Sequence, residues 1–413
     1  MATQSGAATQ GAPGAPVAAV PARDAAASAS ASASASASAP VSMRGVRRRP
    51  GSAVGAAGVR ATGPHEPGSA SAVAAAAGAV DGDAGRAIRF AVETARLLPQ
   101  PGAGQTSLLF DALASAAAAD LTAARVLEAH ADALTILRQA RGDTAEPGST
   151  GTGTQSWGVF AAEGPGVRLS ATRSDGAPGD SGWQLDGTKP WCSLAGSLSH
   201  ALVTAHTTPA GAEPGHRRLF AVDLGHPGVR VHEGSWVATG LTQVPSGPVD
   251  FSAVPAVPVG EDDWYLSRPG FSWGGIQVAA CWWGGAVGVA RQLRRAAEGR
   301  APDQIMRAHL GAVDLALLGA GAALADAAAA IDAGEAVGAD GVLLAARVRG
   351  LVARTVDEVV TRVGHALGPA PLALDARHAR RVADLTLYVR QHHAERDDAA
   401  LGDRVLGEEL PAW

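Results

Sequence analysis

The chain has 413 residues, of which 46% are hydrophobic, and its formal net charge is −5. That length leaves room for about two or three domains with filled cores. The mild negative charge provides no basic field to attract nucleic acid or an anionic membrane surface. The only cysteines are Cys192 and Cys281, which excludes a disulfide framework and a cysteine-built zinc site and favours a cytoplasmic location. No apolar run approaches the ~20 residues of a membrane span, so we expect none.

Residues 1–84 are almost entirely Ala, Ser, Gly, Pro and Thr, with a strict Ala-Ser alternation from Ser28 to Ser38. So few large apolar side chains cannot offset the entropy lost on ordering the chain. This composition predicts a disordered tail.

Residues 85–145 are rich in helix formers. The stretch "TSLLFDALASAAAADLTAARVLEAHADALTILRQA", from Thr106, contains no Gly or Pro, and Asp120 can restart a helix within it. We predict a short N-terminal helical domain. The segment "GDTAEPGSTGTGTQS" that follows breaks helix and is typical of a linker.

The remaining chain predicts two further domains. Between residues 155 and 262, short segments such as "HALVTAH", "RLFAVDL" and "GVRVHEG" alternate with turn residues, which indicates antiparallel strands of a barrel or sandwich. Residues 267–405 return to Ala-rich helical sequence and predict an antiparallel four-helix bundle. The expected helices cover residues 276–298, 303–333, 343–367 and 377–401.

This α+β order, with a β-barrel between two helical domains, resembles the acyl-CoA dehydrogenase superfamily. The motif "LDGTKPWCSLAG" is similar to the family's strand, Gly turn, Lys, any residue, Trp, any residue, and Ser or Thr. In that family the Trp packs on the flavin ring and the hydroxyl lies near flavin N5. The resemblance therefore implies bound FAD, with these roles for Trp191 and Ser193. The alternative is that Trp191 only anchors the loop.

Other matches to the family are partial. "FAAEGPG" resembles the stretch that lines the flavin pyrimidine ring, which implies main-chain contacts from Ala161, Ala162 and Glu163. The usual Thr and Gly-Ser-Asp are missing there, which weakens the case for a CoA thioester. Arg300 resembles the arginine that reaches the FAD pyrophosphate of a neighbouring subunit, and Gly368 stands near the expected adenine. Ordinary turns and helix ends also explain these residues.

The catalytic Glu of the family is replaced. It normally follows an Arg-Asp pair by eight residues, and eight residues after Asp384, the best match for that Asp, stands His392. At ~100° per residue, His392 falls on the same helix stripe as Leu385 and Val389, so we expect it to point inward. An imidazole with a pKa near ~6.5 can act as a base at neutral pH, although a core histidine is an equal alternative. Glu395 is the fallback base.

Three functions remain open. The first is α,β-dehydrogenation of a small molecule such as an acyl-CoA, with hydride passing to flavin N5. The second is a flavin monooxygenase, because such enzymes on this fold lack the Glu and often place His near the flavin; His130 resembles a second such histidine at the substrate site. The third is a non-catalytic protein, since the short helical domain would leave an acyl site incomplete. The resemblance also implies a homodimer or homotetramer, with the electron acceptor or flavin reductase left open.

Overall fold

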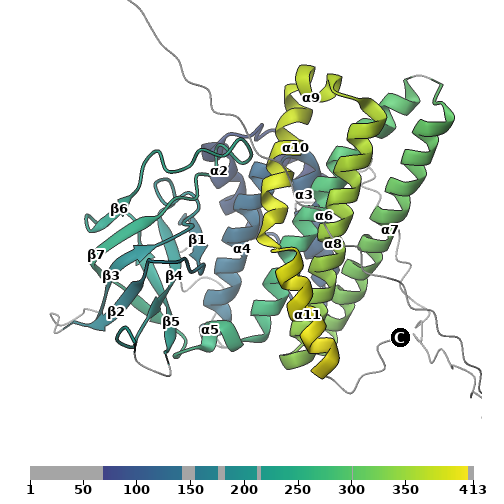
Figure 1. Cartoon of the computed structure of the whole chain (residues 1–413). Helices are drawn as coiled ribbons and strands as arrows, with labels where there is room; N and C mark the ends of the chain where they lie inside the picture. The colour runs from purple at the N-terminus through teal and green to yellow at the C-terminus, as the bar shows by residue number, and fades with distance from the viewer. Residues whose placement is uncertain (1–67, 142–153, 175–181, 212–214, 300, 408–413) are drawn as a thin grey trace, which may run out of the picture. The chain divides into compact units, whose positions relative to one another are not determined.

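The computed structural model describes residues 68–141, 154–174, 182–211, 215–299 and 301–407. All of them belong to one compact unit that spans residues 53–413. Figure 1 shows helices, then a β-sheet, then further helices in chain order, as the sequence predicts.

The N-terminal domain contains four helices: α1 (Ala70–Gly78), α2 (Ala84–Ala95), α3 (Thr106–Ala119) and α4 (Leu121–Arg141). Helix α1 lies inside the segment predicted to be disordered, so the folded chain begins before residue 85 and that boundary is corrected. Ser69 caps α1 by accepting the Ala72 N–H, and Val73 and Ala77 are buried. A helix rich in Ala needs few large side chains when it packs on another helix, here α3.

Eight strands follow: β1 (Trp157–Phe160), β2 (Leu169–Arg173), β3 (Trp183–Lys189), β4 (His200–His206), β5 (Arg217–Asp223), β6 (Val229–Val231), β7 (Val249–Pro255) and β8 (Val257–Val259). They form one sheet in the order β6-β7-β3-β2-β4-β5-β8, with β1 added on β4. Both β1 and β2 run parallel to β4, unlike the antiparallel pairing expected. Neither strand reaches β4 through a hairpin, so no tight turn imposes an antiparallel direction.

The C-terminal domain is built on long helices. Its helices are α5 (Trp264–Ser267), α6 (Pro269–Glu298), α7 (Gln304–Asp332), α8 (Gly338–Leu367), α9 (Ala370–Leu374), α10 (Ala376–Tyr388) and α11 (Glu395–Gly407). The last predicted helix is wrong in one respect, because α10 ends at Tyr388, a 3-10 turn follows, and Ala394 has a φ of 50°. His392 is therefore not on a continuous helix stripe, although its side chain is buried.

Helix α6 crosses α3 at two glycines. A Cβ on Gly284 would lie 2.1 Å from the Ala114 carbonyl oxygen, and one on Gly288 would lie 2.8 Å from that of Ala118. The two backbones approach so closely because neither glycine carries a side chain. This crossing fixes the N-terminal helices to the C-terminal bundle.

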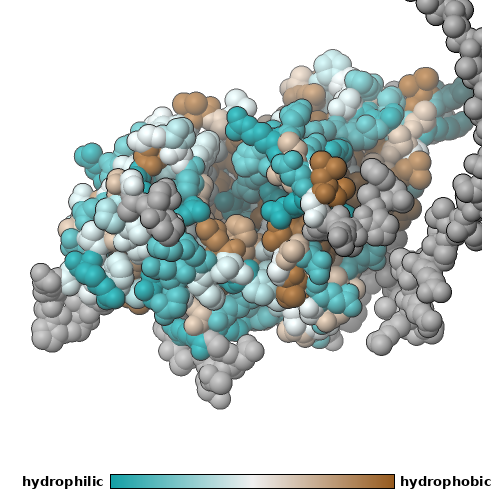
Figure 2. Space-filling model, turned by 60° about the horizontal axis from the view of Figure 1, so that its bottom comes forward, coloured by the Kyte–Doolittle hydropathy of each residue, from teal (hydrophilic) through white to brown (hydrophobic). Residues whose placement is uncertain are grey.

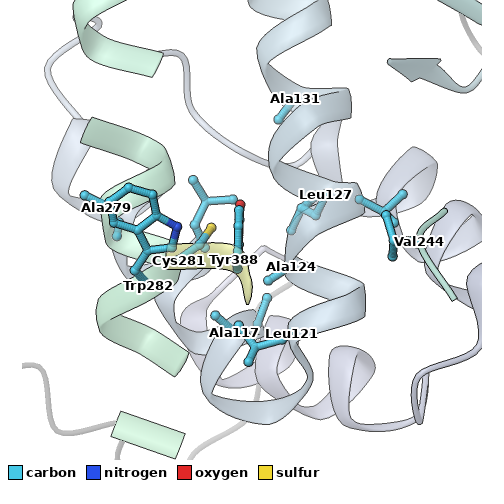
Figure 3. Packing of buried hydrophobic residues seen from close by; sticks show 14 of the residues in the cluster. Ala117, Leu121, Ala124, Leu127, Ala131, Val244, Ala279, Cys281, Trp282 and Tyr388 are labelled. Carbon is cyan, nitrogen blue, oxygen red and sulfur yellow. The ribbon is translucent and has the colours of Figure 1, made fainter. Parts of the chain in front are cut away.

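Helix α4 lies between the sheet and the other helices (Figure 1). On one side, the Trp157 N–H of β1 donates to His130 Nδ1 at 3.2 Å. On the other side, α4 packs on α6 and α10. Figure 3 shows Tyr388 between α4 and α6, with its ring edge-on to Trp282.

Helix α7 presents an apolar surface. It is long and apolar enough to cross a bilayer by length and composition alone, with 28% of its most apolar window buried, so our expectation that no run approaches that length is wrong. Leu315 and Leu318 are 70% and 57% exposed. The face drawn in Figure 2 is mostly hydrophilic, with separate hydrophobic patches. A single helix of this length and composition is weak evidence for a membrane span.

Candidate functional site

The loop after β3 turns one tryptophan outward. Trp191 has a φ of 59° and is 60% exposed, and a positive φ is uncommon for so bulky a residue. The neighbouring Cys192 is buried, and its N–H donates to the Gly247 carbonyl at 3.0 Å. Cys192 anchors the loop, whereas the Trp191 ring lies at the surface. The alternative that Trp191 is the buried anchor is wrong.

Ser193 joins the loop to helix α4. Its Oγ lies 2.8 Å from Ser246 Oγ, which itself donates to the Val244 carbonyl. Arg125 Nη2 donates to Ser193 Oγ at 3.2 Å. Ser193 therefore donates toward Ser246 and accepts from Arg125. The hydroxyl stands at the edge of a small pocket formed by α4, β1 and two loops of the β domain.

Residues 161–163, which follow β1, are held in place through the side chain of Glu163. Lys189 Nζ, which is buried, donates to Glu163 Oε1 at 2.7 Å and to Thr204 Oγ1 at 2.8 Å. Burial lowers the pKa of Lys189. Burial also opposes ionisation of Glu163, but the hydrogen bond from Lys189 and the positive charges of Lys189, His206 and Arg217 together outweigh burial and lower the pKa of Glu163. Because the Glu163 side chain is engaged, Ala161, Ala162 and Glu163 can offer a ligand their main chain, as the resemblance implies.

Arg125, Glu128 and Tyr388 form a buried polar cluster that the sequence did not predict. Glu128 Oε2 accepts from Arg125 Nη1 and from the Tyr388 hydroxyl, both at 3.1 Å. The Arg125 guanidinium lies 5.7 Å from the centre of the Tyr388 ring. Burial raises the pKa of Glu128, and the Arg125 charge opposes that shift. The available signal was an arginine and a glutamate three residues apart on an otherwise apolar stretch of helix.

Two more guanidinium groups extend this cluster. Arg268 Nη2 lies 3.5 Å from Asp132 Oδ1, and its Nη1 donates to Gln139 Oε1 at 2.6 Å. Arg349 donates to the Gln391 carbonyl at 3.1 Å, and its guanidinium lies 4.6 Å from the centre of the Trp282 ring. The cluster thus brings together charged side chains from α4, α6 and α8, with Arg268 at the start of α6.

His130 is buried and accepts a hydrogen bond from the main chain of Trp157. The residue is 2% exposed, and burial together with the Arg96 charge lowers its pKa to about 4. A neutral ring can accept the Trp157 N–H at Nδ1, as observed. His130 contacts β1 next to the pocket but does not belong to its lining.

His392 and Glu395 lie outside the lining of the Ser193 pocket. His392 Nδ1 accepts the Ala394 N–H at 3.2 Å, and its Nε2 lies 3.8 Å from Asp397 Oδ2. Burial lowers the pKa of His392. Glu395 is exposed in the first turn of α11, where a carboxylate favourably meets the helix dipole.

Of the two residues expected near the FAD pyrophosphate and adenine, the structure describes only Gly368, which is not part of the pocket lining. Arg300 lies outside the described residues. Gly368 ends α8 with a φ of 66°, and no heavy atom lies within 4 Å of the place where its Cβ would be. A positive φ at the end of a helix explains this glycine locally.

Asp384→Asn is expected to flatten the pH dependence of stability between about pH 4 and pH 6. Asp384 Oδ1 accepts the Leu241 N–H at 2.6 Å, and burial raises its pKa from 3.8 to about 6, against the opposing charges of Arg380 and Arg381. Because the folded protein holds this proton more tightly than the unfolded chain, stability decreases as pH rises through that window, by about 3 kcal/mol in total.

Urea unfolding at several pH values measures this slope. The asparagine keeps an oxygen for the Leu241 N–H, so the hydrogen bond serves as an internal control. Equal slopes for the variant and the wild type would contradict the assignment.

No protein-family model matches the sequence, and no curated protein matches it. Solved structures do match. FMN-bound TdsC from Paenibacillus sp. A11-2, a dibenzothiophene monooxygenase, is 18% identical, with a TM-score of 0.68 over 83% of this chain and 97% of TdsC. Nitrososynthase from Micromonospora carbonacea var. africana is 18% identical, with a TM-score of 0.67 over 86% of this chain and 99% of that one. KijD3 in complex with FMN and a dTDP-sugar is 20% identical, with a TM-score of 0.65 over 83% of this chain and 92% of KijD3.

These likenesses confirm the predicted fold class. The chain has the acyl-CoA dehydrogenase-like fold, with helical domains on both sides of a β domain. At identities of 20% or less, these likenesses show the fold only, and the reaction has to be inferred from the residues of the site.

Proposed function

We propose that this protein is a flavin-dependent oxidoreductase. The observation that carries the proposal is the loop of Trp191 and Ser193, which offers an exposed flat ring and, two residues on, a hydroxyl at a pocket edge. Two neighbours on this fold, TdsC and KijD3, are described with FMN. We therefore propose FAD or FMN as the cofactor, with FAD being the form that the sequence resemblance implies.

The residues present fit a flavin ring. Trp191 would stack on the isoalloxazine, because its ring lies at the surface. Ser193 would orient the N5 edge through its hydroxyl, and the main chain of Ala161 and Ala162 would meet the pyrimidine. Bound flavin would supply two-electron redox chemistry, while the protein binds, orients and excludes water.

Of the two reactions, we propose oxygen-dependent oxidation of a small molecule first. Where acyl-CoA dehydrogenases have their catalytic Glu, this chain has His392, and the fallback Glu395 is exposed to solvent. Neither residue offers a buried carboxylate at that position. The fold neighbours include an enzyme described as a monooxygenase and another described as a nitrososynthase.

Dehydrogenation remains the second candidate because of Glu128. This buried carboxyl has a raised pKa and is linked to Ser193 through Arg125. A carboxylate whose pKa is raised by burial is a suitable proton acceptor at neutral pH. Glu128 would then replace the missing Glu in removing a proton from an acyl thioester or similar substrate.

We also propose a homo-oligomer that uses helix α7. Three leucine or isoleucine side chains on α7 are more than half exposed: Ile305, Leu315 and Leu318. Exposed apolar side chains along one helix favour contact with another copy of the chain. Light scattering that gives the mass of a monomer would contradict this.

Trp191→Ala is expected to weaken flavin binding at least about 10-fold, because ring stacking and the apolar area it buries are lost. Titration of purified protein with FMN and with FAD, followed by flavin fluorescence, measures the affinities. Phe271→Ala is the matched control, since Phe271 is an aromatic side chain of α6 that is 43% exposed. Failure to bind either flavin would support the non-catalytic reading, and an unchanged affinity in Trp191→Ala would exclude the assigned loop.

Two assays of the flavin-loaded protein distinguish dehydrogenation from oxygen-dependent oxidation. Anaerobic bleaching of the flavin by a panel of acyl-CoAs would identify a dehydrogenase. Product formation that requires oxygen and an added flavin reductase would identify a monooxygenase.

A further inference from the structure

We propose that Ser246 is a positioning residue, which holds the hydrogen of the Ser193 hydroxyl away from the flavin, so that Ser193 accepts a hydrogen bond there and the protein favours reduced flavin. The inference rests on the proposed function, because it takes Ser193 to lie at the N5 edge of the bound flavin. It adds to that function how the site sets the balance between the two redox states.

The direction of each hydrogen bond at Ser246 follows from the groups involved. Ser246 Oγ lies 3.0 Å from the Val244 carbonyl oxygen, which has no hydrogen to donate, so Ser246 donates there. A hydroxyl carries one hydrogen only. In the 2.8 Å contact between Ser246 Oγ and Ser193 Oγ, the hydrogen therefore comes from Ser193.

Arg125 occupies a second direction around the Ser193 oxygen. Its Nη2 donates to Ser193 Oγ at 3.2 Å, and a guanidinium accepts no hydrogen bond. Glu128 holds Arg125 in place, because Glu128 Oε2 accepts from Arg125 Nη1 at 3.1 Å. A hydroxyl has one hydrogen and two lone pairs, and these contacts use the hydrogen and one lone pair of Ser193. Ser193 is therefore left to act as an acceptor toward a ligand.

The two loops that carry these serines are joined through their main chains. The Cys192 N–H donates to the Gly247 carbonyl at 3.0 Å. The Leu194 N–H donates to the Pro245 carbonyl at 2.8 Å. Neither bond involves the Ser246 side chain, so a substitution of that side chain leaves the two loops in register.

A flavin ring presents a different group at N5 in each redox state. Oxidised N5 has a lone pair and no hydrogen, whereas two-electron reduction places a hydrogen on N5. The free lone pair of Ser193 would therefore face an acceptor in the oxidised state and a donor in the reduced state, and only the second pair forms a hydrogen bond. One neutral hydrogen bond changes an affinity about 3- to 10-fold, so this contact favours the reduced state by that factor.

The test measures the affinities of the protein for oxidised FMN and FAD and, without oxygen, for the dithionite-reduced flavins, together with the reduction potential of the bound flavin. In Ser246→Ala the Ser193 hydrogen can turn to oxidised N5, so oxidised flavin is expected to bind about 3- to 10-fold more tightly and reduced flavin equally well. In Ser193→Ala reduced flavin is expected to bind about 3- to 10-fold more weakly and oxidised flavin equally well. Both substitutions lower the reduction potential, by about 30 mV for a tenfold change in the ratio of the two affinities.

Two further variants serve as controls. Ser246→Thr keeps a hydroxyl at this position and is expected to retain the wild-type affinities and potential. Ser267→Ala removes a serine of helix α5 whose Oγ also donates to a main-chain carbonyl, that of Asp263, at 3.1 Å. It is expected to leave the affinities and the potential unchanged.

Shifts of the opposite sign would overturn the inference. If Ser193 donates to oxidised N5 in the wild type, Ser193→Ala weakens the binding of oxidised flavin and raises the reduction potential. Unchanged affinities in Ser246→Ala would remove Ser246 from this role. A protein that binds neither flavin refutes the proposed function and this inference together, whereas a protein that binds flavin and gives either of the other two results refutes this inference alone.

Discussion

Gly284→Ala is expected to destabilise the protein by at least about 3 kcal/mol. The added Cβ would lie 2.1 Å from the Ala114 carbonyl oxygen and 2.6 Å from its Cα, so backbone atoms of α3 must move. Overpacking of a core costs about 1–3 kcal/mol even where side chains can adjust, and a backbone contact adjusts less. Urea unfolding followed by circular dichroism measures the change.

Gly319→Ala is the matched control for that substitution. Gly319 also lies within a long helix, α7, but no heavy atom lies within 4 Å of the place where its Cβ would be. There, alanine should stabilise the protein by about 0.5–1 kcal/mol through helix propensity. If Gly284→Ala proved as stable as Gly319→Ala, the close crossing of α3 and α6 would be incorrect.

Asp132→Ala is expected to cost about 3–5 kcal/mol, because it leaves the Arg268 charge buried without its carboxylate. The side chains of Arg268 and Asp132 are 3% and 13% exposed. Gln139 offers Arg268 a neutral acceptor only. Thermal and urea unfolding of the variant measure the loss.

Two variants sharpen that prediction. Arg268→Met/Asp132→Asn removes both charges and should recover most of the stability, since a buried pair is worth little against neutral groups of similar volume. Asp398→Ala breaks the exposed pair with Arg354, whose side chains are 62% and 38% exposed, and should cost less than about 1 kcal/mol. If Asp132→Ala costs no more than Asp398→Ala, the pair is not buried in solution.

The sequence predicted most of the architecture because its signals are local. Turn residues separate the short strands, and glycine-free helical runs place α3 and α4 within a residue or two of their observed bounds. The missed helix α1 has the same Ala-rich composition as the tail before it. The packing of α1 on α3 is a contact between distant parts of the chain, which composition does not reveal.

The candidate site was predicted in part. The motif that holds Trp191 and Ser193 is contiguous in the chain, so a resemblance could reveal it, and the structure places Ser193 at a pocket. His392 was chosen by its spacing from Asp384, and its inward orientation was predicted from a helix that in fact ends at Tyr388. Because helical spacing has no meaning beyond a helix end, the predicted position of His392 was right about burial but gave no contact with the pocket.

By itself, the sequence determined the order of the domains, the positions of the long helices and the loop that carries Trp191. Only the tertiary structure decided which groups share a site. Arg125 and Glu128 meet Tyr388 across about 260 residues of chain, and Arg125 meets Ser193 on a loop of another domain. Local propensity carries no information about such distant contacts, which arise when α4 is packed between the sheet and the bundle. The buried contacts of Arg125, Glu128 and Tyr388 are therefore visible only in the folded structure.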